Sequence, residues 1–302
     1  MRILLFGANG QVGHELRRSL APLGEVVATT RSGAFEDGTL CERADFDVPA
    51  ALPALIERIA PDIVVNAAAY TAVDKAESDH DAAFRANAEA PARIAEACAA
   101  RGAWLVHYST DYVFDGTGSR PYREGDATAP LGVYGASKLA GEDAIRASGA
   151  PHRIFRTAWV YAAYGRNFMR TMLRLAAERD ELHVVADQRG TPTPAALIAD
   201  ITAAALAQPS VPSGLWHLTA AGETTWHGFA EAIVADAHAR GLLPRMPRVV
   251  PIATTDYPTP AKRPAYSVLD TARLRSDFGI APPAWRTGLA AVLETQRTST
   301  GG

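Results

Sequence analysis

The chain has 302 residues, a formal net charge of −3 and charged residues along its whole length. This length allows one large or two moderate domains with a substantial core. The lack of a basic stripe argues against nucleic acid and membrane partners. Cys41 and Cys98 form no disulfide or metal pattern, and the apolar run at residues 3–6 is too short for a signal peptide or membrane span. We therefore expect a cytoplasmic protein.

A glycine-rich turn follows this first apolar run and precedes an amphipathic helical pattern. A buried strand, a tight turn and a helix in this order are typical of a dinucleotide-binding site. Glycines let backbone N–H groups approach a phosphate, and the helix N-terminus adds partial positive charge. The alternative is a purely structural turn. The residues predicted to bind the cofactor here are Gly7, Asn9, Gly10, Gln11, Val12 and Gly13.

The second predicted strand, residues 25–29, ends at Thr30 and Arg31. An NAD-binding fold usually carries an acidic residue here for the ribose 2′-hydroxyl, and this chain has none. Arg31 could instead pair with a 2′-phosphate, so we expect NADPH, with NADH possible. The alternative is an exposed arginine in a mobile loop. Asp45 and Phe46 are expected to hold the adenine through a hydrogen bond and a ring contact.

Small and polar residues follow the next two predicted strands. A helix over 49–60 leads to a strand over 63–66 and then to Ala67, Ala68 and Ala69, whose small side chains leave room for a cofactor. A long helix over 82–101 leads to a strand over 104–108. This strand ends at Thr110 and Asp111, polar residues at the edge where an open sheet gathers its ligand.

Tyr134 and Lys138 lie four residues apart at the start of a predicted helix over 133–147. At this spacing the two side chains share one helix face, which on its own is also typical of a solvated surface. Hydride delivery to a carbonyl leaves an alkoxide that needs a proton. Tyr134 would supply it and Thr110 would bond the same oxygen. Lys138 would lower the pKa of the phenol and hold the cofactor ribose.

Strands and helices alternate up to the predicted strand over 152–157, which indicates a Rossmann-type, doubly wound parallel α/β fold. A strand over 182–185 and a helix over 195–207 follow. We expect residues 1–165 to form the dinucleotide-binding domain, with a return of 182–208. Residues 166–302 would mainly build a smaller substrate-binding lobe.

The pattern Gly7-x-x-Gly10-x-x-Gly13 with Tyr134-x-x-x-Lys138 resembles the extended short-chain dehydrogenase/reductase superfamily over almost the full chain. Four longer segments are more specific and lie at residues 66–77, 109–116, 155–161 and 257–264. They resemble members that reduce the C4 ketone of dTDP-6-deoxy-L-lyxo-4-hexulose to dTDP-L-rhamnose with NADPH or NADH. The resemblance thus implies an oxidoreductase of dTDP-rhamnose biosynthesis, which serves cell-surface polysaccharides.

Carried over by motif, the resemblance makes Thr110, Tyr134 and Lys138 catalytic. It places the cofactor on the glycine turn, Asp45, Phe46, the three alanines, Tyr134 and Lys138. Thr110, Asp111 and Trp159 would contact the dTDP-sugar substrate. An aromatic face suits stacking on a sugar or base, although Trp159 could also be a core residue.

Some members resemble one another in a dimer bridged by magnesium through three glutamates. Glu15 and Glu294 fit two of these positions, but Ala196 occupies the third. Two carboxylates without the third would bind the cation more weakly. We therefore expect no metal site and no obligatory Mg²⁺, and a monomer or weak homodimer.

Two other functions fit the same residues. One is a reductase or epimerase of another nucleotide 4-keto sugar, which the catalytic residues cannot distinguish. The other is a non-catalytic NADP-binding regulatory subunit, because relatives include such a partner of methionine adenosyltransferase. The intact Thr110, Tyr134 and Lys138 favour an enzyme.

Overall fold

The computed structural model describes residues 1–300, and only the backbone of residues 297–300. Its centre is a seven-stranded sheet in which every pairing is parallel. The strands are, in spatial order, β11 (Gly214–His217), β6 (His152–Thr157), β5 (Trp104–Thr110), β4 (Ile63–Asn66), β1 (Arg2–Phe6), β2 (Glu25–Thr30) and β3 (Glu42–Arg43). The strand order reverses between β1 and β4, where open α/β sheets bind their ligands. The predicted doubly wound fold is confirmed.

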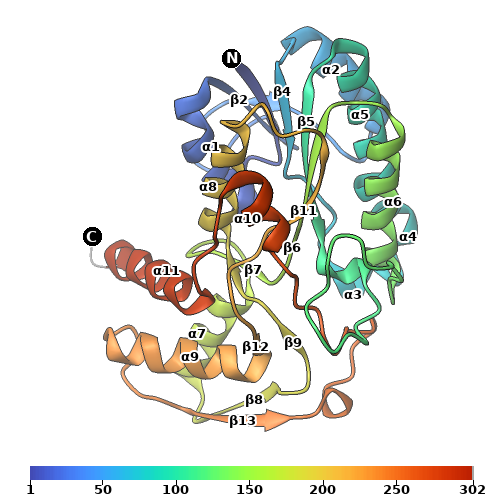
Figure 1. Cartoon of the computed structure of the whole chain (residues 1–302). Helices are drawn as coiled ribbons and strands as arrows, with labels where there is room; N and C mark the ends of the chain where they lie inside the picture. Colours follow the sequence, from blue (N-terminus) through green and yellow to red (C-terminus); the bar gives the residue numbers. More distant parts are fainter. Residues whose placement is uncertain (301–302) are drawn as a thin grey trace.

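Helices cover both faces of this sheet because its strands are buried on both sides. In β1, Ile3 and Leu5 pack into one apolar cluster, whereas Leu4 and Phe6 pack into another. The first cluster includes residues of α1 (Gln11–Leu20), α8 (Ala195–Leu206) and α10 (Ala272–Phe278). The second includes residues of α2 (Leu52–Ile59), α5 (Ala90–Arg101) and α6 (Val133–Ala147). Figure 1 shows α1 and α8 on one side of the sheet and α2, α5 and α6 on the other.

The long helix expected over 82–101 is interrupted. The short helices α3 (Val73–Ala76) and α4 (His80–Phe84) precede a π-helical turn, Arg85–Glu89, and only then does α5 begin. Pro91 has no N–H, and in a continuous helix its ring would meet the carbonyl of Asn87. The wider turn accommodates this, and such turns are frequent at functional sites.

A smaller lobe packs below the sheet in Figure 1. Its core holds apolar residues of α7 (Phe168–Glu178), α9 (Trp226–Ala239) and α11 (Trp285–Thr300), including Phe229, Ile233 and Leu289. Strands β8 (Glu181–Val185) and β13 (Arg248–Ile252) pair in parallel at its edge. Outside the main sheet lie four two-residue strands, β7 (Val160–Tyr161), β9 (Arg189–Gly190), β10 (Thr193–Pro194) and β12 (Thr224–Thr225). No helix in the described part of the chain is long and apolar enough to cross a membrane.

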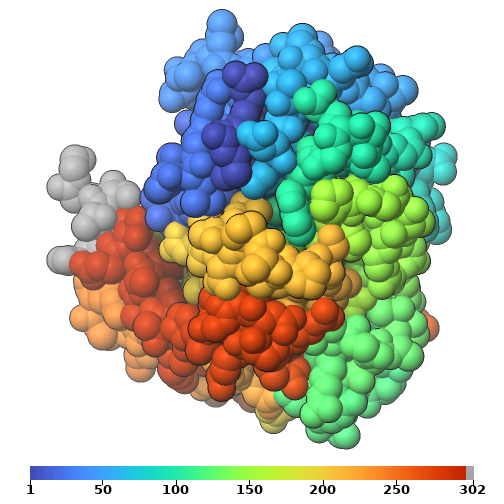
Figure 2. Space-filling view, turned by 45° about the horizontal axis from the view of Figure 1, so that its top comes forward, coloured from blue at the N-terminus to red at the C-terminus, as the bar shows by residue number. Residues whose placement is uncertain are grey.

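The expected return of 182–208 to the first domain needs correction, because β8 pairs with β13 in the lobe. In β8 only alternate residues, Leu182 and Val184, are buried, as suits a strand covered on one face. Helix α8 does return and packs on α1. Strand β11, which lies within residues 166–302, also forms the edge of the main sheet. In Figure 2 the gold to red C-terminal residues accordingly fill the centre of the face, between blue and green segments.

Candidate active site

A cavity of about 850 Å³ opens along the carboxyl ends of β1, β2, β4, β5 and β6. Most of the residues singled out in the sequence line it. They are Gly7, Asn9, Gly10, Gln11, Val12, Arg31, Phe46, Ala67, Ala68, Ala69, Thr110, Asp111, Tyr134, Lys138 and Trp159. Further lining residues to which the sequence gave no role include Asp47, Tyr70, Thr71, Ser109, Tyr112, Thr157 and Arg166. Gly13 and Asp45 lie outside this lining.

The glycine turn has the geometry that a pyrophosphate needs. Gly7 has φ +77°, and a Cβ there would lie 2.7 Å from the backbone nitrogen of Ala68. The Gly10 N–H donates to the Gly7 carbonyl at 3.0 Å and closes the turn. A Cβ on Gly13 would lie 2.0 Å from the same carbonyl, so this glycine lets α1 pack on the turn instead of facing a ligand. The turn and the N-terminus of α1 therefore fit a dinucleotide.

Arg31 lines the cavity and lies within ion-pair distance of two carboxylates. Its side chain is 70% exposed, with Nε 3.7 Å from Asp45 Oδ1 and Nη1 3.8 Å from Asp47 Oδ2. Asp45 also lies 3.7 Å from Arg43, so it pairs with arginines beside the cavity. Phe46 packs edge-on against Phe6 and faces the space expected for the adenine. Arg31 can therefore reach a ligand in the cavity, but Asp45 and Asp47 would compete with that ligand for its guanidinium group.

Thr110, Tyr134 and Lys138 all line the cavity. Thr110 ends β5 and donates through Oγ1 to Asp111 Oδ1 at 3.0 Å. Tyr134 and Lys138 lie one turn apart in α6, and the ring of Tyr134 packs edge-on against Tyr112. Residues from a strand end and a helix are therefore brought to one place, as the sequence predicted.

Helix α6 is held in this position by contacts from three other segments. The Val133 N–H donates to Glu77 Oε1 at 2.8 Å, which satisfies one free donor of the helix N-terminus. A Cβ on Gly135 would lie 2.2 Å from the Tyr112 carbonyl, so only glycine allows this close approach. From the π-helical turn, Asn87 donates to Ser137 Oγ at 3.1 Å and to the Tyr70 carbonyl at 3.0 Å. Tyr134 is thereby fixed against the loop after β5.

Burial shifts the pKa values of three titratable groups that the sequence singled out on the cavity wall. It raises the pKa of Tyr134, and the hydroxyl of Thr110 acts in the opposite direction. It lowers the pKa of Lys138 to about 8, with Glu142 acting against this shift. It raises the pKa of Asp111 to about 6. In the protein alone the pKa of the Tyr134 phenol is therefore raised and not lowered, because burial outweighs the groups that act against it.

The amine of Lys138 faces a histidine instead. Its Nζ lies 3.2 Å from Nε2 of His107, whose Nδ1 lies 3.1 Å from Nδ2 of Asn66. His107 and Asn66 are partners in the register of β5 and β4, which explains their contact. Neither residue was predicted from the sequence to have a role. The only available signal was a polar residue in each of two otherwise apolar strands.

Trp159 lines the cavity but is also packed into the lobe. Its backbone has φ +47°, a left-handed conformation that is uncommon for a tryptophan. Its indole stacks on Trp226 of α9 with ring centroids 3.5 Å apart and an interplanar angle of 6°. One face is therefore covered by a residue that the sequence analysis did not single out. Asp111 is buried near the hydroxyls of Thr110 and Ser267, and its Oδ2 has no well-formed hydrogen bond among the described residues.

Three of the longer sequence segments meet beside Tyr134. Arg263 donates to Asp74 Oδ2 at 2.7 Å and to the hydroxyl of Tyr112 at 3.1 Å. The Ala261 N–H also donates to Asp74, at 3.3 Å. The lobe is thus tied across the cavity to the loops that follow β4 and β5.

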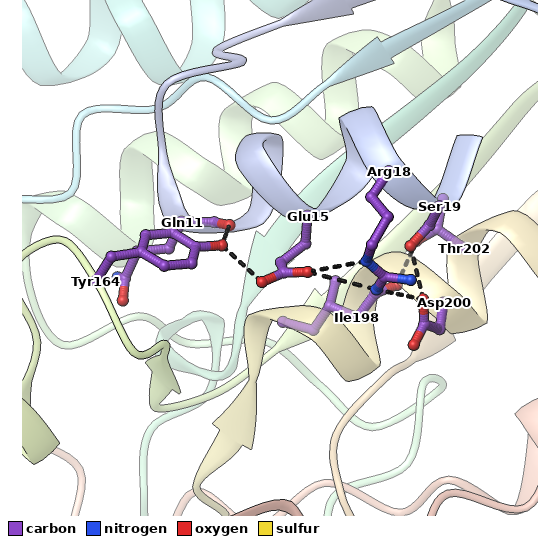
Figure 3. Close-up of polar contacts among 8 residues, drawn as sticks. All are labelled: Gln11, Glu15, Arg18, Ser19, Tyr164, Ile198, Asp200 and Thr202. Atoms are coloured by element: carbon purple, nitrogen blue, oxygen red, sulfur yellow. Dashed lines mark hydrogen bonds and ion pairs between the residues drawn. The ribbon is translucent and has the colours of Figure 1, made fainter. Parts of the chain in front are cut away.

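The carboxylate of Glu15 is already engaged by neutral and cationic donors (Figure 3). Tyr164 donates to Oε1 at 2.8 Å, and Arg18 lies 3.4 Å from Oε2 and 2.8 Å from Asp200. Ala196 offers no oxygen ligand from its side chain. These residues do not fit a three-carboxylate magnesium site. Among the residues that the structure describes, no group of three or more His, Cys, Asp or Glu side chains is placed to hold a metal ion.

Comparisons with known proteins agree on one family. The family model described as RmlD substrate binding domain matches residues 1–298. A dTDP-4-dehydrorhamnose reductase from Burkholderia thailandensis is 53% identical over 295 residues, which cover 95% of this chain and 96% of the relative.

Two solved structures are similar to the whole chain. The crystal structure of a dTDP-4-dehydrorhamnose reductase from Clostridium acetobutylicum has a TM-score of 0.89 and 36% identity, and covers 98% of this chain and 100% of that one. The dTDP-4-dehydrorhamnose reductase of Bacillus anthracis in complex with NADP has a TM-score of 0.88 and 34% identity, with 97% and 99% covered. With the glycine turn and the Thr110, Tyr134 and Lys138 cluster in place, the chain belongs to the dTDP-4-dehydrorhamnose reductase family.

Proposed function

We propose that this chain reduces the C4 ketone of dTDP-6-deoxy-L-lyxo-4-hexulose to dTDP-L-rhamnose, with Tyr134 as the proton donor and NADPH as the preferred cofactor. The observation that carries the proposal is the meeting of Thr110, Tyr134 and Lys138 in the cavity that the glycine turn opens. Relatives with the same family name support the substrate.

The chain's own residues would orient the ketone and supply the proton. The bound cofactor supplies a hydride, which leaves negative charge on the ketone oxygen. Tyr134 Oη would give its proton to that oxygen, and its raised pKa keeps the phenol protonated at neutral pH. Thr110 Oγ1 has one proton, which it gives to Asp111 in the protein without ligands. With substrate bound it would turn that proton to the ketone oxygen, where a hydrogen bond is worth most because charge develops there. Lys138 would hold the ribose of the cofactor.

Asp111 and Trp159 are proposed to contact the sugar nucleotide. Asp111 has an unpartnered, buried carboxylate oxygen that a substrate hydroxyl could satisfy. Trp159 lies at the cavity with one indole face already stacked on Trp226, so the stack would stiffen it for contact with the sugar.

Arg31 is proposed to read the 2′-phosphate of NADPH. The only basic side chains on the cavity wall besides Lys138 are Arg31 and Arg166, within the described residues. Arg31 follows β2, where the 2′ position of the ribose is bound in this fold. The NADP found in the Bacillus anthracis relative supports this cofactor.

We also propose that the enzyme needs no magnesium and is a monomer or a weak homodimer. The reason is the pairing of Glu15 with Tyr164 and Arg18, which leaves little need for a further cation.

The experiment that tests the function is an assay of the purified protein with NADPH and the dTDP-keto sugar. We expect NADPH oxidation matched one to one by dTDP-L-rhamnose, identified by chromatography against the standard. The same keto sugar linked to UDP is the control for the nucleotide. Binding of NADPH without any turnover would contradict the proposal.

A further inference from the structure

Arg166 is a basic side chain on the cavity wall that has no role in the proposed reaction so far. It is exposed, and it lines the cavity together with residues 10–12 of the glycine turn. Arg31, the other exposed arginine of this wall, has two carboxylates within ion-pair distance. Within the part of the chain that the structure describes, no ion pair or hydrogen bond engages the side chain of Arg166. Its charge is therefore available to an anion in the cavity.

The chain on either side of Arg166 is fixed against Gln11 of the glycine turn. Nδ2 of Asn167 donates to Oε1 of Gln11 at 2.7 Å. A Cβ on Gly165 would lie 3.1 Å from Cγ of Gln11, which shows how closely the two segments approach. The hydroxyl of Tyr164 lies 3.2 Å from the Gln11 carbonyl oxygen (Figure 3). Because the residues before and after it contact the turn, Arg166 is held beside the segment that would receive a phosphate.

The two side-chain amides at this contact have a fixed orientation. Asn167 is the N-cap of α7, and its Oδ1 accepts from the Arg170 N–H at 3.0 Å. A backbone N–H can only donate, so Nδ2 is the atom of Asn167 that faces Gln11. Gln11 must therefore offer its oxygen to Asn167, which leaves its own amide nitrogen as a donor for a ligand. The neutral donor of Gln11 and the cation of Arg166 thus stand on adjoining segments of the cavity wall.

A dinucleotide carries a full negative charge on each phosphate of its pyrophosphate, whereas the glycine turn and the N-terminus of α1 supply only partial positive charge. An arginine can complete such a site, because its planar guanidinium donates parallel hydrogen bonds to phosphate oxygens.

We propose that Arg166 binds the pyrophosphate of the nicotinamide cofactor together with the glycine turn. This inference rests on the proposed cofactor and adds to its site a residue that lies outside the sequence motif. The sugar nucleotide also carries a diphosphate, but the attachment of residues 164–167 to Gln11 favours the cofactor.

This role differs from the role proposed for Arg31. The pyrophosphate is common to NADPH and NADH, whereas only NADPH has the 2′-phosphate. Loss of Arg166 should therefore weaken both cofactors by the same factor, and loss of Arg31 should weaken NADPH alone.

Fluorescence titration of Arg166→Ala with NADPH and with NADH tests the proposal. We expect each Kd to rise about tenfold or more, because a charge-assisted hydrogen bond to phosphate is lost. Arg166→Lys keeps the charge but not the planar fork, so its constants should fall between those of the wild type and the alanine variant. The matched control is Arg174→Ala, which removes an arginine of α7 that pairs with Glu178 and does not line the cavity. It should leave both constants within about twofold of the wild type.

Two ligands that lack the cofactor pyrophosphate separate the alternatives by calorimetry. Adenosine 2′-monophosphate and dTDP should each bind Arg166→Ala as tightly as they bind the wild type. Weaker binding of dTDP with unchanged cofactor constants would place Arg166 at the sugar nucleotide, and a loss for NADPH alone would place it at the 2′-phosphate. Either result, or an unchanged Kd for both cofactors, would overturn the proposal. These titrations need no turnover, and a wild-type protein that bound neither cofactor would refute the proposed cofactor itself.

Discussion

Burial sets the proton affinity of the side chains that line the cavity. It raises the pKa of the Tyr134 phenol further above neutrality and lowers the pKa of the Lys138 amine to about 8. It also makes the ionised form of Asp111 unfavourable. A phenol that keeps its proton until charge develops on the substrate is suited to act as an acid.

The buried negative charge of Asp111 should lower the free energy of unfolding. Its folded pKa is raised from 3.8 to about 6, so the folded state binds the proton more tightly than the unfolded state. The cost is therefore present above pH 6 and disappears as the pH falls towards 4. We predict that Asp111→Asn raises the free energy of unfolding by about 3 kcal/mol at pH 8 and by about half as much at pH 5.

Urea unfolding of both proteins at the two pH values measures this gain. A gain of equal size at pH 5 and pH 8, or a loss at pH 8, would show that the carboxylate is not strained by burial.

The cofactor preference can be tested at Arg31. Arg31→Ala should raise the Kd for NADPH about tenfold or more, because a charged hydrogen bond to phosphate is lost, and should leave the Kd for NADH within about twofold. Arg43→Ala is the matched control, since Arg43 pairs with the same Asp45 but does not line the cavity. Fluorescence titration gives both constants. Equal weakening of the two cofactors would rule out recognition of the 2′-phosphate.

Local sequence patterns predicted the side chains of the cavity better than their neighbours. The glycine turn, Thr110 and Tyr134 stand at strand or helix ends, which periodicity can locate. The partners of Arg31 and Lys138 could not be predicted in this way. Asp47 is distant in space until β2 and the loop after β3 are folded, and His107 meets Lys138 only across a strand and a helix.

At the level of elements, the position of Tyr134 depends on how α6 begins. The first N–H groups of a helix lack partners within it. The N–H of Val133 donates instead to the carboxylate of Glu77, which lies directly after α3. The segment at 66–77 therefore lines the cavity near its start and caps helix α6 at its end.

Removing this cap should destabilise the protein. We predict that Glu77→Ala lowers the free energy of unfolding by about 1–2 kcal/mol, whereas Glu77→Gln, which keeps an acceptor oxygen, loses less than half of that. Urea unfolding at pH 7 compares the three proteins. If the alanine variant were as stable as the wild type, the cap would not hold α6.

The sequence predicted most helices and strands, but it did not always predict which element each of them packs against or pairs with. The strand near 182–185 was predicted at the right place, but nothing local to it indicates that it pairs with β13, some sixty residues later. The π-helical turn was missed because the apolar spacing continues through it. Pro91 was the available signal, since proline inside a helix removes a bond and clashes one turn earlier.

On the scale of the whole molecule, the chain crosses repeatedly between the sheet and the lobe. Arg263 and Trp226 reach from the lobe to Tyr112 and Trp159, so the lobe supports two residues of the cavity wall from behind.

Assembly and metal dependence belong to this scale. Because Arg18 and Tyr164 already engage Glu15, we predict that Mg²⁺ changes neither the sedimentation coefficient nor the rate of NADPH oxidation. Calorimetry with MgCl₂ and sedimentation with and without EDTA measure both. Micromolar binding of Mg²⁺ coupled to dimerisation would contradict the prediction.

The central claim is that Tyr134 gives the proton to the reduced ketone. The most direct measurement is the rate of NADPH oxidation in a single turnover by Tyr134→Phe with the dTDP-keto sugar, beside Tyr112→Phe, which removes the neighbouring phenol of the same cavity. We predict a fall of about 100-fold or more for Tyr134→Phe, with the Kd for NADPH nearly unchanged, and a much smaller fall for Tyr112→Phe. A wild-type rate in Tyr134→Phe would contradict the assignment.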